Sequence, residues 1–363
     1  MANNKEQEDK TQELDPKAME MGQRILQGMI EARDAGVQFK RSYFVSNSFP
    51  RNALTGREYT GMNIGNLLSY RFESPDFIPG GQVSQLYKQS EGKIRIKKGE
   101  KACYALFAKT YEKKTGEFDE NGDEISKQGR MHKWGPTYNV SQLEGPIDDY
   151  IKKLEPRVMN EFEELELIGK IQKVFEAQGL TFQEVAKGQP CYIPALDVIQ
   201  MPERHRYPNA QAHARTKAHE MGHATGHPTR MNRDQAHKFG SKGYAFEELV
   251  AENFSILLGM KTGHAYDPST HDQHASYLNS WIDALTNDPA AMKDFLLPAL
   301  SQAYKAYDAV MKQVLAMDIE LEQEEKQELS NFQMREEERL RIVNAEPVMP
   351  ILLPPKKVFN IAR

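Results

Sequence analysis

The segment AHEMGHATGHPTR holds two histidines and a glutamate at a spacing that suits a metal site. His219 and His223 are four residues apart, so in a helix both imidazoles lie on one face and can reach a single ion. Glu220 follows the first histidine, where a carboxylate can take a proton from water on the metal. Gly226 and Pro228 predict that the helix ends soon after the second histidine. The sequence therefore predicts a divalent-metal site, most simply zinc, of the kind that metallopeptidases use to activate water.

A third protein ligand has to come from another segment. In the pattern HExxHxxGxxH it is a histidine, but Thr229 stands at that position. The predicted helix GYAFEELVAENFSILLGM offers glutamates instead, and Glu248 and Glu252 share one face of it whereas Glu247 points elsewhere. We expect Glu248 to be the ligand and Glu252 to orient a ligand histidine. The alternative is that all three are surface glutamates on an ordinary helix.

Further residues around the motif have predicted supporting roles. His227 follows His223 by one turn but lies beyond the expected end of the helix, so we interpret it as a residue that supports a ligand or caps the helix. Tyr207, Tyr244 and His237 are all possible donors to a transition state, and the sequence does not decide among them. The upstream segment CYIPALDVIQMP is predicted as an edge strand against which an extended substrate can lie.

The first half of the chain is basic and rich in aromatic residues. Between Lys40 and Lys114 fourteen Lys and Arg residues oppose six Asp and Glu residues, a net charge of +8. Bases that contact phosphates, interleaved with rings that stack on unpaired bases, are typical of a groove for single-stranded DNA. The contacts that we expect come from Arg51, Arg57, Tyr59, Lys93, Arg95, Lys97, Lys98 and Lys101. A domain with buried aromatic residues and a solvated basic face is the alternative.

Composition and periodicity divide the chain into four parts. Residues 1–16 have almost no aliphatic side chains and are predicted to be a disordered leader. Residues 17–145 begin with an amphipathic helix and continue as strand-like pieces, including a hairpin formed by KIRIK and ACYALFA. Residues 146–317 have mostly helical patterns, and residues 318–363 are predicted as an acidic helix followed by a Pro-rich tail. We expect an α+β protein.

The segment 112–134 is predicted to be a long excursion from that hairpin. Asp119, Asn121 and Asp123 look like the start of a calcium-binding loop. Gly122, however, stands at the fourth position instead of the sixth, and no glutamate closes the loop. We therefore predict a turn rather than a metal site there.

Cysteine content and hydropathy indicate a cytoplasmic protein without a membrane partner. Cys103 and Cys191 are the only cysteines, whereas a secreted protein of this size more often carries a disulfide framework. The N-terminus has no apolar core of a signal peptide, and no stretch of about 18 apolar residues follows. The net charge of −5 does not argue against a nucleic-acid partner, because opposed local charges cancel in the sum.

Several motifs, taken in order along the chain, resemble the ArdC family of antirestriction proteins. They are RNALTGREYTGMN, KKGEKACYALF, YNVSQLEG, YIPALDVIQMP, AHEMGHATGHPTRMNRD and YAFEELVAE. The resemblance covers roughly residues 20–310 and departs from the family's pattern at the excursion 112–134. It implies an N-terminal helix plus a small curved antiparallel sheet that binds single-stranded DNA, followed by a mostly helical zincin-like metallopeptidase domain. A family member is expected to protect incoming mobile DNA from host restriction.

Carried onto these positions, the resemblance implies that His219 and His223 are metal ligands and that Glu220 is the catalytic carboxylate. It places the third ligand in EELVAE without deciding between Glu248 and Glu252. The expected partners are single-stranded DNA and a protein substrate such as a host restriction enzyme. Two alternatives remain: a DNA-binding protein whose metal site is structural or catalytically silent, and a soluble metallopeptidase with no nucleic-acid role.

Overall fold

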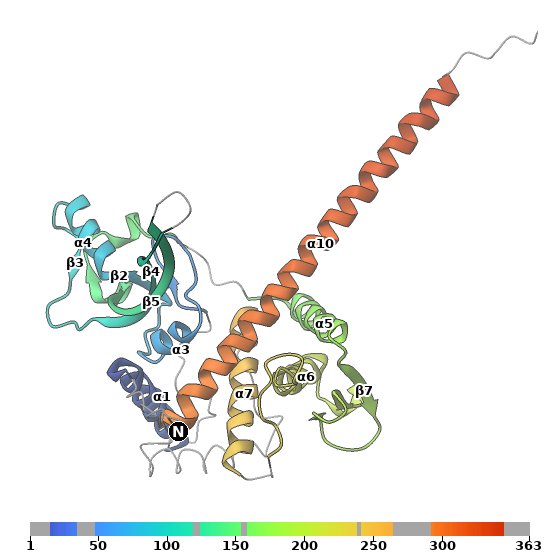
Figure 1. Cartoon of the computed structure of the whole chain (residues 1–363), viewed down its shortest axis with the longest axis horizontal. Coiled ribbons are helices and arrows are strands. Elements are labelled where there is room, and N and C mark those ends of the chain that lie inside the picture. Colours follow the sequence, from blue (N-terminus) through green and yellow to red (C-terminus); the bar gives the residue numbers. More distant parts are fainter. Residues whose placement is uncertain are drawn as a thin grey trace, which may run out of the picture. The chain divides into compact units, whose positions relative to one another are not determined.

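The computed structural model combines helices with small sheets (Figure 1), which confirms the α+β class. It describes residues 15–34, 48–118, 124–153, 158–237, 241–263 and 292–344. The leader predicted at residues 1–16 lies almost wholly outside this part of the chain. Two compact units are present, Met1–Lys312 and Gln313–Arg363. The domain boundary expected near residue 145 falls inside the first unit and stays a prediction.

Helix α1 (Pro16–Asp34) begins where the amphipathic pattern predicted it. Met21, Ile25 and Met29 follow one another at a spacing of four residues and are fully buried, so they form one apolar stripe. From the same helix, Arg24 donates hydrogen bonds to Asn66 and Ser69, at 2.8 and 3.0 Å. These contacts attach α1 to the segment around helix α3 (Met62–Leu68).

The largest sheet has the order β1–β2–β5–β4. Its strands are β1 (Arg51–Asn52), β2 (Asp76–Pro79), β4 (Cys103–Phe118) and β5 (Glu124–Asn139). The pairs β2–β5 and β4–β5 are antiparallel as expected, whereas β1 pairs with β2 in parallel. Helix α4 (Gly80–Gln89) buries Val83 and Leu86 in the core that lies beside this sheet.

The hairpin predicted from KIRIK and ACYALFA is wrong. Strand β3 (Arg95–Ile96) pairs with β6 (Leu143–Glu144), while ACYALFA from Cys103 onward belongs to β4 and pairs with β5. The cause is packing between distant residues, because Ile94 is buried in one cluster with Leu143, and Cys103 is buried in another. Strands β3 and β4 therefore pair with different strands because they pack into different hydrophobic clusters.

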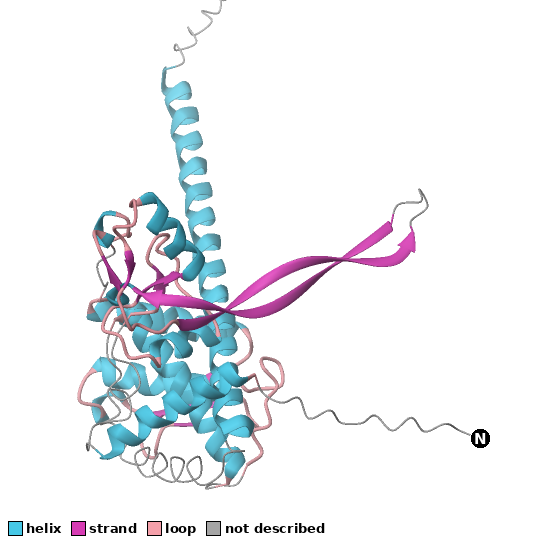
Figure 2. Ribbon diagram, turned by 90° about the vertical axis from the view of Figure 1, so that its left-hand side faces the viewer, coloured by secondary structure: helices cyan, strands magenta, loops and turns pink. Residues whose placement is uncertain are grey.

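The excursion predicted at 112–134 is the outer part of a long β4–β5 hairpin (Figure 2). Pairing runs from Cys103 opposite Thr137 out to Phe118 opposite Glu124, with an irregularity after Lys114. Only the last residues of β5 also pair with β2. The rest of the hairpin is therefore a two-stranded ribbon. The turn predicted at Asp119–Asp123 lies outside the described residues.

The second half begins with helix α5 (Glu161–Ala177) and a sheet of order β7–β9–β8. Strand β7 (Thr181–Val185) is parallel to β9 (Val198–Pro202), and β8 (Cys191–Ile193) is antiparallel to β9. The segment predicted as one strand is thus two, with a turn between them where Asp197 adopts a φ of 50°. Strand β8 lies at the edge of this sheet.

Three further helices complete the described chain. Helix α6 (Ala210–Ala224) packs against α5, α7 (Lys242–Thr262) and strands β8 and β9. Helix α10 (Leu297–Asn344) follows a π-helical turn, η5 (Met292–Leu296). Up to Lys312, α10 buries apolar residues in the first unit, whereas from Asp318 onward its described side chains are mostly exposed, as predicted for the acidic segment. In the described part of the chain, none of the helices has the length and apolar character that crossing a membrane requires.

The start of α5 offers a test of local stability. Asn160 accepts a hydrogen bond from the backbone N–H of Glu163 at 3.0 Å, and the Glu163 carboxylate accepts one from the backbone N–H of Asn160 at 2.9 Å. Replacing Asn160→Ala removes this capping box and should lower the free energy of unfolding by about 1 kcal/mol. Asn160→Ser should keep most of it. Urea unfolding followed by circular dichroism measures both, and equal stability of all three proteins would contradict the assignment.

Candidate metal centre

Helix α6 lies unusually close to helix α7, and a glycine allows this. Asn209 caps α6 by accepting a hydrogen bond from the backbone N–H of Ala212 at 2.7 Å. One face of the helix then presents Gly222 to Ala251 of α7, where an added Cβ would lie 2.8 Å from the Cα of Ala251. Any larger residue would push the helices apart. This contact brings the two histidines of α6 next to the glutamates of α7.

His219, His223 and Glu248 come together as the sequence predicted. One possible ligand atom from each lies within 4.8 Å of the others. The Nε2 atoms of His219 and His223 are 3.5 and 3.6 Å from the two carboxylate oxygens of Glu248. Tetrahedral zinc with bonds of about 2.1 Å needs ligand atoms about 3.4 Å apart. The donor set and its spacing therefore fit a divalent metal, and within the described residues this is the only such group.

Glu252 takes a different place beside the same histidine. Its carboxylate lies 3.4 Å from Nδ1 of His219, the nitrogen on the other side of the ring from Glu248. A carboxylate in this position fixes the tautomer and the orientation of a ligand histidine. The side chains of Glu248 and Glu252 are only 15% and 14% exposed, which contradicts the alternative of surface glutamates. The geometry favours Glu248 as the ligand.

The close helices are held by an arginine that sequence reasoning did not single out. Arg233 binds both carboxylate oxygens of Glu247, with Nε 2.7 Å and Nη2 2.9 Å away. Its guanidinium also donates to the hydroxyl of Thr225 at 2.8 Å and to the carbonyl of Gly222 at 3.1 Å. The residue therefore connects the C-terminal end of α6 to the start of α7. A lone arginine in a loop gives no pattern that would predict this.

Charges within the cluster favour an ionised ligand carboxylate. Burial would raise the pKa of Glu248, but the charge of His223 and the hydrogen bond with His219 hold that pKa well below its usual range. Burial would lower the pKa of His219, but its two carboxylate partners raise it above the usual value. For His223 burial prevails and lowers the pKa to about 4. An anionic Glu248 and a neutral His223 are the forms that bind a metal.

Glu220 lies between the metal cluster and the edge strand. It is buried, and its carboxylate accepts a hydrogen bond from the backbone N–H of Tyr192 in β8. Burial raises the pKa of Glu220 to about 7, although the charge of His219 and this hydrogen bond both act to lower it. A carboxyl with a pKa near neutrality can both accept and donate a proton. The position and the pKa suit the role expected of Glu220.

The three candidate donors to a transition state have different surroundings. Tyr244 hydrogen-bonds to Glu248 and so contributes to holding that carboxylate. His237 lies beside Gly243 and 3.9 Å from Asp234. Tyr207 interacts with Glu220, and its buried hydroxyl finds no hydrogen-bond partner among the described residues. Tyr207 is therefore the best placed of the three.

His227 belongs to a network around Asp197 and not to the metal cluster. Its Nδ1 is 2.8 Å from the hydroxyl of Thr229 and 3.9 Å from Asp197. Asp197 also accepts a hydrogen bond from the Tyr192 hydroxyl at 2.9 Å and pairs with Arg230. This network links the turn after β8 to the segment that follows α6.

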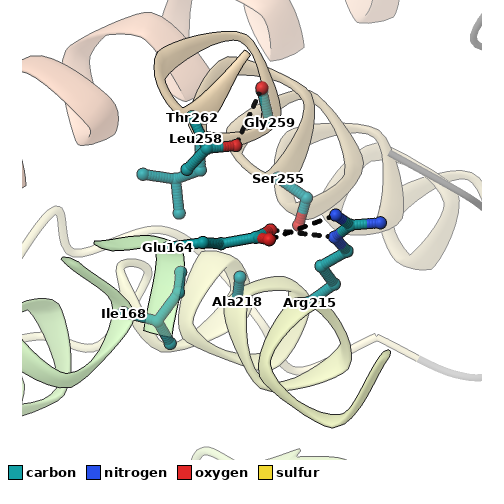
Figure 3. A pocket seen from close by; sticks show the side chains of 8 residues that line it. All are labelled: Glu164, Ile168, Arg215, Ala218, Ser255, Leu258, Gly259 and Thr262. Carbon is teal, nitrogen blue, oxygen red and sulfur yellow. Dashed lines mark hydrogen bonds and ion pairs between the residues drawn. The ribbon is translucent and has the colours of Figure 1, made fainter. Parts of the chain in front are cut away.

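A small pocket between α5, α6 and α7 has a structural role (Figure 3). It contains a buried ion pair in which Arg215 contacts Glu164 at 2.9 Å. Gln211 donates to the same carboxylate at 2.8 Å. Because the Glu164 carboxylate is bound by both Arg215 and Gln211, the pair attaches α6 to α5.

Two family models match the chain in succession. The N-terminal domain of the anti-restriction factor ArdC matches residues 19–140, and a zincin-like metallopeptidase matches residues 169–294. The chain belongs to the ArdC family. Its predicted relationship is thereby confirmed, and the helix pair that holds His219 and Glu248 lies within the zincin-like match.

Relatives of this ArdC family member include two DNA primases TraC of Escherichia coli. They are 32% and 31% identical over 72% of this chain, which spans only 24% and 17% of their length. An uncharacterized protein, y4eC, of Sinorhizobium fredii is 27% identical over 67% of this chain and 76% of its own. Crystal structures of ArdC from plasmid R388, one metal-free and one Mn(II)-bound, share the fold at 24% identity. Their TM-scores are 0.56 and 0.55, and the match covers 81% of this chain and 98% and 97% of theirs.

The structure separates the predicted DNA contacts into two groups. The exposed ones are Arg57, Lys93, Arg95, Lys97, Lys98 and Lys101. Arg51 instead forms a largely buried ion pair with Asp76 at 2.7 Å, and Tyr59 packs against the core cluster of Leu67 and Phe77. These two residues therefore hold the fold of the ArdC N-terminal domain together, because both are too enclosed to meet a DNA strand.

Most of the described aromatic residues in the basic segment lie in the core or pack against it. Phe49 and Phe77 are buried, as the alternative reading of the composition expected. Tyr87 differs, since it is 52% exposed at the end of α4 and interacts with Arg95. Its ring is accessible and lies near exposed basic side chains. In the sequence, its place near the end of an amphipathic helix is the feature that could have predicted this exposure.

Metal titration distinguishes the two candidate glutamates. Wild-type protein should bind about one zinc or manganese ion per chain, and the double variant His219→Ala, His223→Ala should bind none. Loss of an orienting carboxylate costs about 10- to 100-fold in metal affinity, so Glu252→Gln should fall in that range and Glu248→Gln beyond it. Isothermal titration calorimetry gives the affinities. A larger loss in Glu252→Gln would reverse the assignment.

The close approach of α6 and α7 predicts an asymmetric effect of two glycine substitutions. Gly222→Ala should destabilise the protein by about 1–3 kcal/mol through overpacking against Ala251, and should weaken metal binding. Gly169→Ala in α5 is a matched control, since an added Cβ there meets no atom within 4 Å. It should be neutral or stabilising by up to about 1 kcal/mol. Similar thermal shifts for both variants would contradict the close contact.

Proposed function

We propose that this chain is an antirestriction protein with two working parts. Residues 17–145 bind single-stranded DNA, and residues 146–317 carry a zinc-dependent, peptidase-like site. Together they protect incoming DNA of a mobile element from restriction in the recipient cytoplasm. The observation that carries the proposal is the buried carboxyl of Glu220, which lies beside a two-histidine, one-glutamate cluster and next to a strand at the edge of its sheet.

The donor set supports zinc and hydrolysis. Two imidazole nitrogens and one carboxylate leave a coordination position open, as in catalytic rather than structural zinc sites. When bound, the metal supplies Lewis acidity to water and to a carbonyl group. Glu220 accepts the proton of the attacking water and passes it to the leaving group. The hydroxyl of Tyr207 donates to the oxygen on which negative charge develops.

Strand β8 supports an extended peptide as the substrate. Its only partner in the described sheet is β9, so its other edge can pair with an added strand. Tyr192 in this strand already donates its backbone N–H to Glu220. A peptide that pairs along β8 therefore passes close to the proton-transferring carboxyl. A host restriction enzyme is the substrate that the antirestriction family suggests.

The first part of the chain supports a DNA partner through its charge. Six bases from the predicted set are exposed, although Arg95 is paired with Glu144, and the ring of Tyr87 is exposed beside them. These side chains can meet phosphates and unpaired bases. The relatives named DNA primases agree with a DNA partner. In this proposal the lysines supply affinity without sequence preference, and Tyr87 adds stacking.

Fluorescence anisotropy with a labelled oligonucleotide tests the DNA-binding half. Affinity should fall steeply with salt, and the triple variant Lys93→Gln, Lys98→Gln, Lys101→Gln should reduce the slope of log affinity against log salt by about two. Tyr87→Ala should weaken binding by about 1–3 kcal/mol, the contribution of one stacked base. Arg51→Gln should mainly lower stability. Absent or salt-independent binding would refute the proposal.

Transfer of unmodified plasmid DNA into a restricting host tests the hydrolytic half. Glu220→Gln should keep metal and DNA binding yet lose most of the protection, since it removes only the proton acceptor. Comparing the proteomes of recipient cells that receive wild-type or Glu220→Gln protein should show the cleaved target. Full protection by Glu220→Gln would favour the second candidate function, a DNA-binding protein with a catalytically silent metal site.

A further inference from the structure

The β4–β5 ribbon is used by none of the activities above. In its outer part, from Ala105 opposite Gly135 to Lys114 opposite Ser126, each strand pairs only with the other among the described residues. Figure 2 shows these two strands as a long twisted hairpin that runs away from the rest of its sheet. A hairpin with so few packing partners gains little stability from the core, so a binding role has to be considered.

The two faces of the ribbon differ in charge. Cross-strand partners share a face, and successive residues alternate between faces. We define the lysine face by the register pairs Phe107–Lys133, Lys109–Met131, Tyr111–Gly129 and Lys113–Lys127. It carries four lysines and no acid. The alternate positions carry Glu112 in addition to their bases.

Two features of the lysine face favour an anionic partner. Lys113 stands opposite Lys127 in the register, and like charges at paired positions destabilise a hairpin unless counter-charges offset them. Lys109 and Lys133 are exposed. The ring of Tyr111 lies across Gly129, where an added Cβ would be 2.6 Å from its Cζ, and it is still 44% exposed. At Lys109, Tyr111 and Lys133 the face is therefore basic and open to solvent.

The dimensions of the ribbon suit duplex DNA better than a single strand. Two strands about 4.8 Å apart form a ribbon that the major groove of B-DNA, about 12 Å wide, can admit. Lysines on such a ribbon contact phosphates and carry no sequence information. Tyr111 is the only exposed ring at the defined positions, so charge rather than base stacking dominates this face.

We propose that the lysine face of the β4–β5 ribbon binds the backbone of double-stranded DNA. Combined with a single-strand site on the same domain, it directs the protein to junctions where a single strand enters a duplex. The inference rests on the proposed single-strand binding only for the junction preference. Duplex binding by the ribbon is a separate property with its own test.

Three labelled DNA probes test the inference with the full-length chain: a 12-nucleotide single strand, a 12-base-pair blunt hairpin, and the same hairpin with the single strand as a tail. The tailed hairpin should bind at least about tenfold more tightly than the single strand alone. Lys109→Gln, Lys133→Gln should remove most of this gain and lower the salt slope for the tailed hairpin by about two, since each lost phosphate contact removes about 0.9. Binding to the single strand should not change.

The matched control removes the same charge from the alternate register positions. Lys114→Gln, Arg130→Gln should retain most of the gain from the duplex. Equal losses in the two double variants, a loss of single-strand affinity in Lys109→Gln, Lys133→Gln, or a hairpin that adds nothing to the tail would each overturn the proposal. If the single strand alone does not bind while the blunt hairpin does, the proposed single-strand function fails and the ribbon assignment stands.

Discussion

The site depends on the contact between α6 and α7, which Gly222 and Arg233 create from two directions. Gly222 removes the side chain that would separate the helices at Ala251, and Arg233 ties the end of one helix to Glu247 of the other. Glu247 is adjacent in sequence to Glu248. The ion pair therefore also fixes the position of the Glu248 carboxylate relative to α6. A buried pair of this kind is strongly destabilising when one partner is lost, because the other charge is left uncompensated.

The role proposed for each glutamate near the motif follows from the residue that its carboxylate contacts. His219 meets Glu248 on one ring nitrogen and Glu252 on the other, while Glu220 is directed at the backbone of β8. The three carboxyl groups belong to the same residue type, but each has a different environment. Burial raises the pKa of Glu220, whereas the histidines hold that of Glu248 low.

Local patterns were enough to predict the features that repeat along one helix. His219 and His223 share a face of one helix, and Glu248 and Glu252 share a face of another, because each pair is spaced by four residues. Helical periodicity alone predicts both faces, but it does not predict that the two helices are in contact. Strand partners were not predictable in the same way, because β3 and β6 are joined by the burial of Ile94 beside Leu143, far away in the sequence. The roles of Arg51, Tyr59 and Arg233 were hidden for the same reason, since a charge or ring has no pattern that reveals an ion-pair partner or a core.

Strand β8 comprises three residues, Cys191–Ile193, which corresponds to about 10 Å of extended chain. An added strand can make main-chain hydrogen bonds over this short distance only, and few of its side chains would contact the protein. If the edge serves as the substrate platform, selection would act on conformation more than on sequence. A substrate protein would need a locally unfolded segment to pair with β8. Proteins with a loop that opens readily would therefore be cleaved in preference to others.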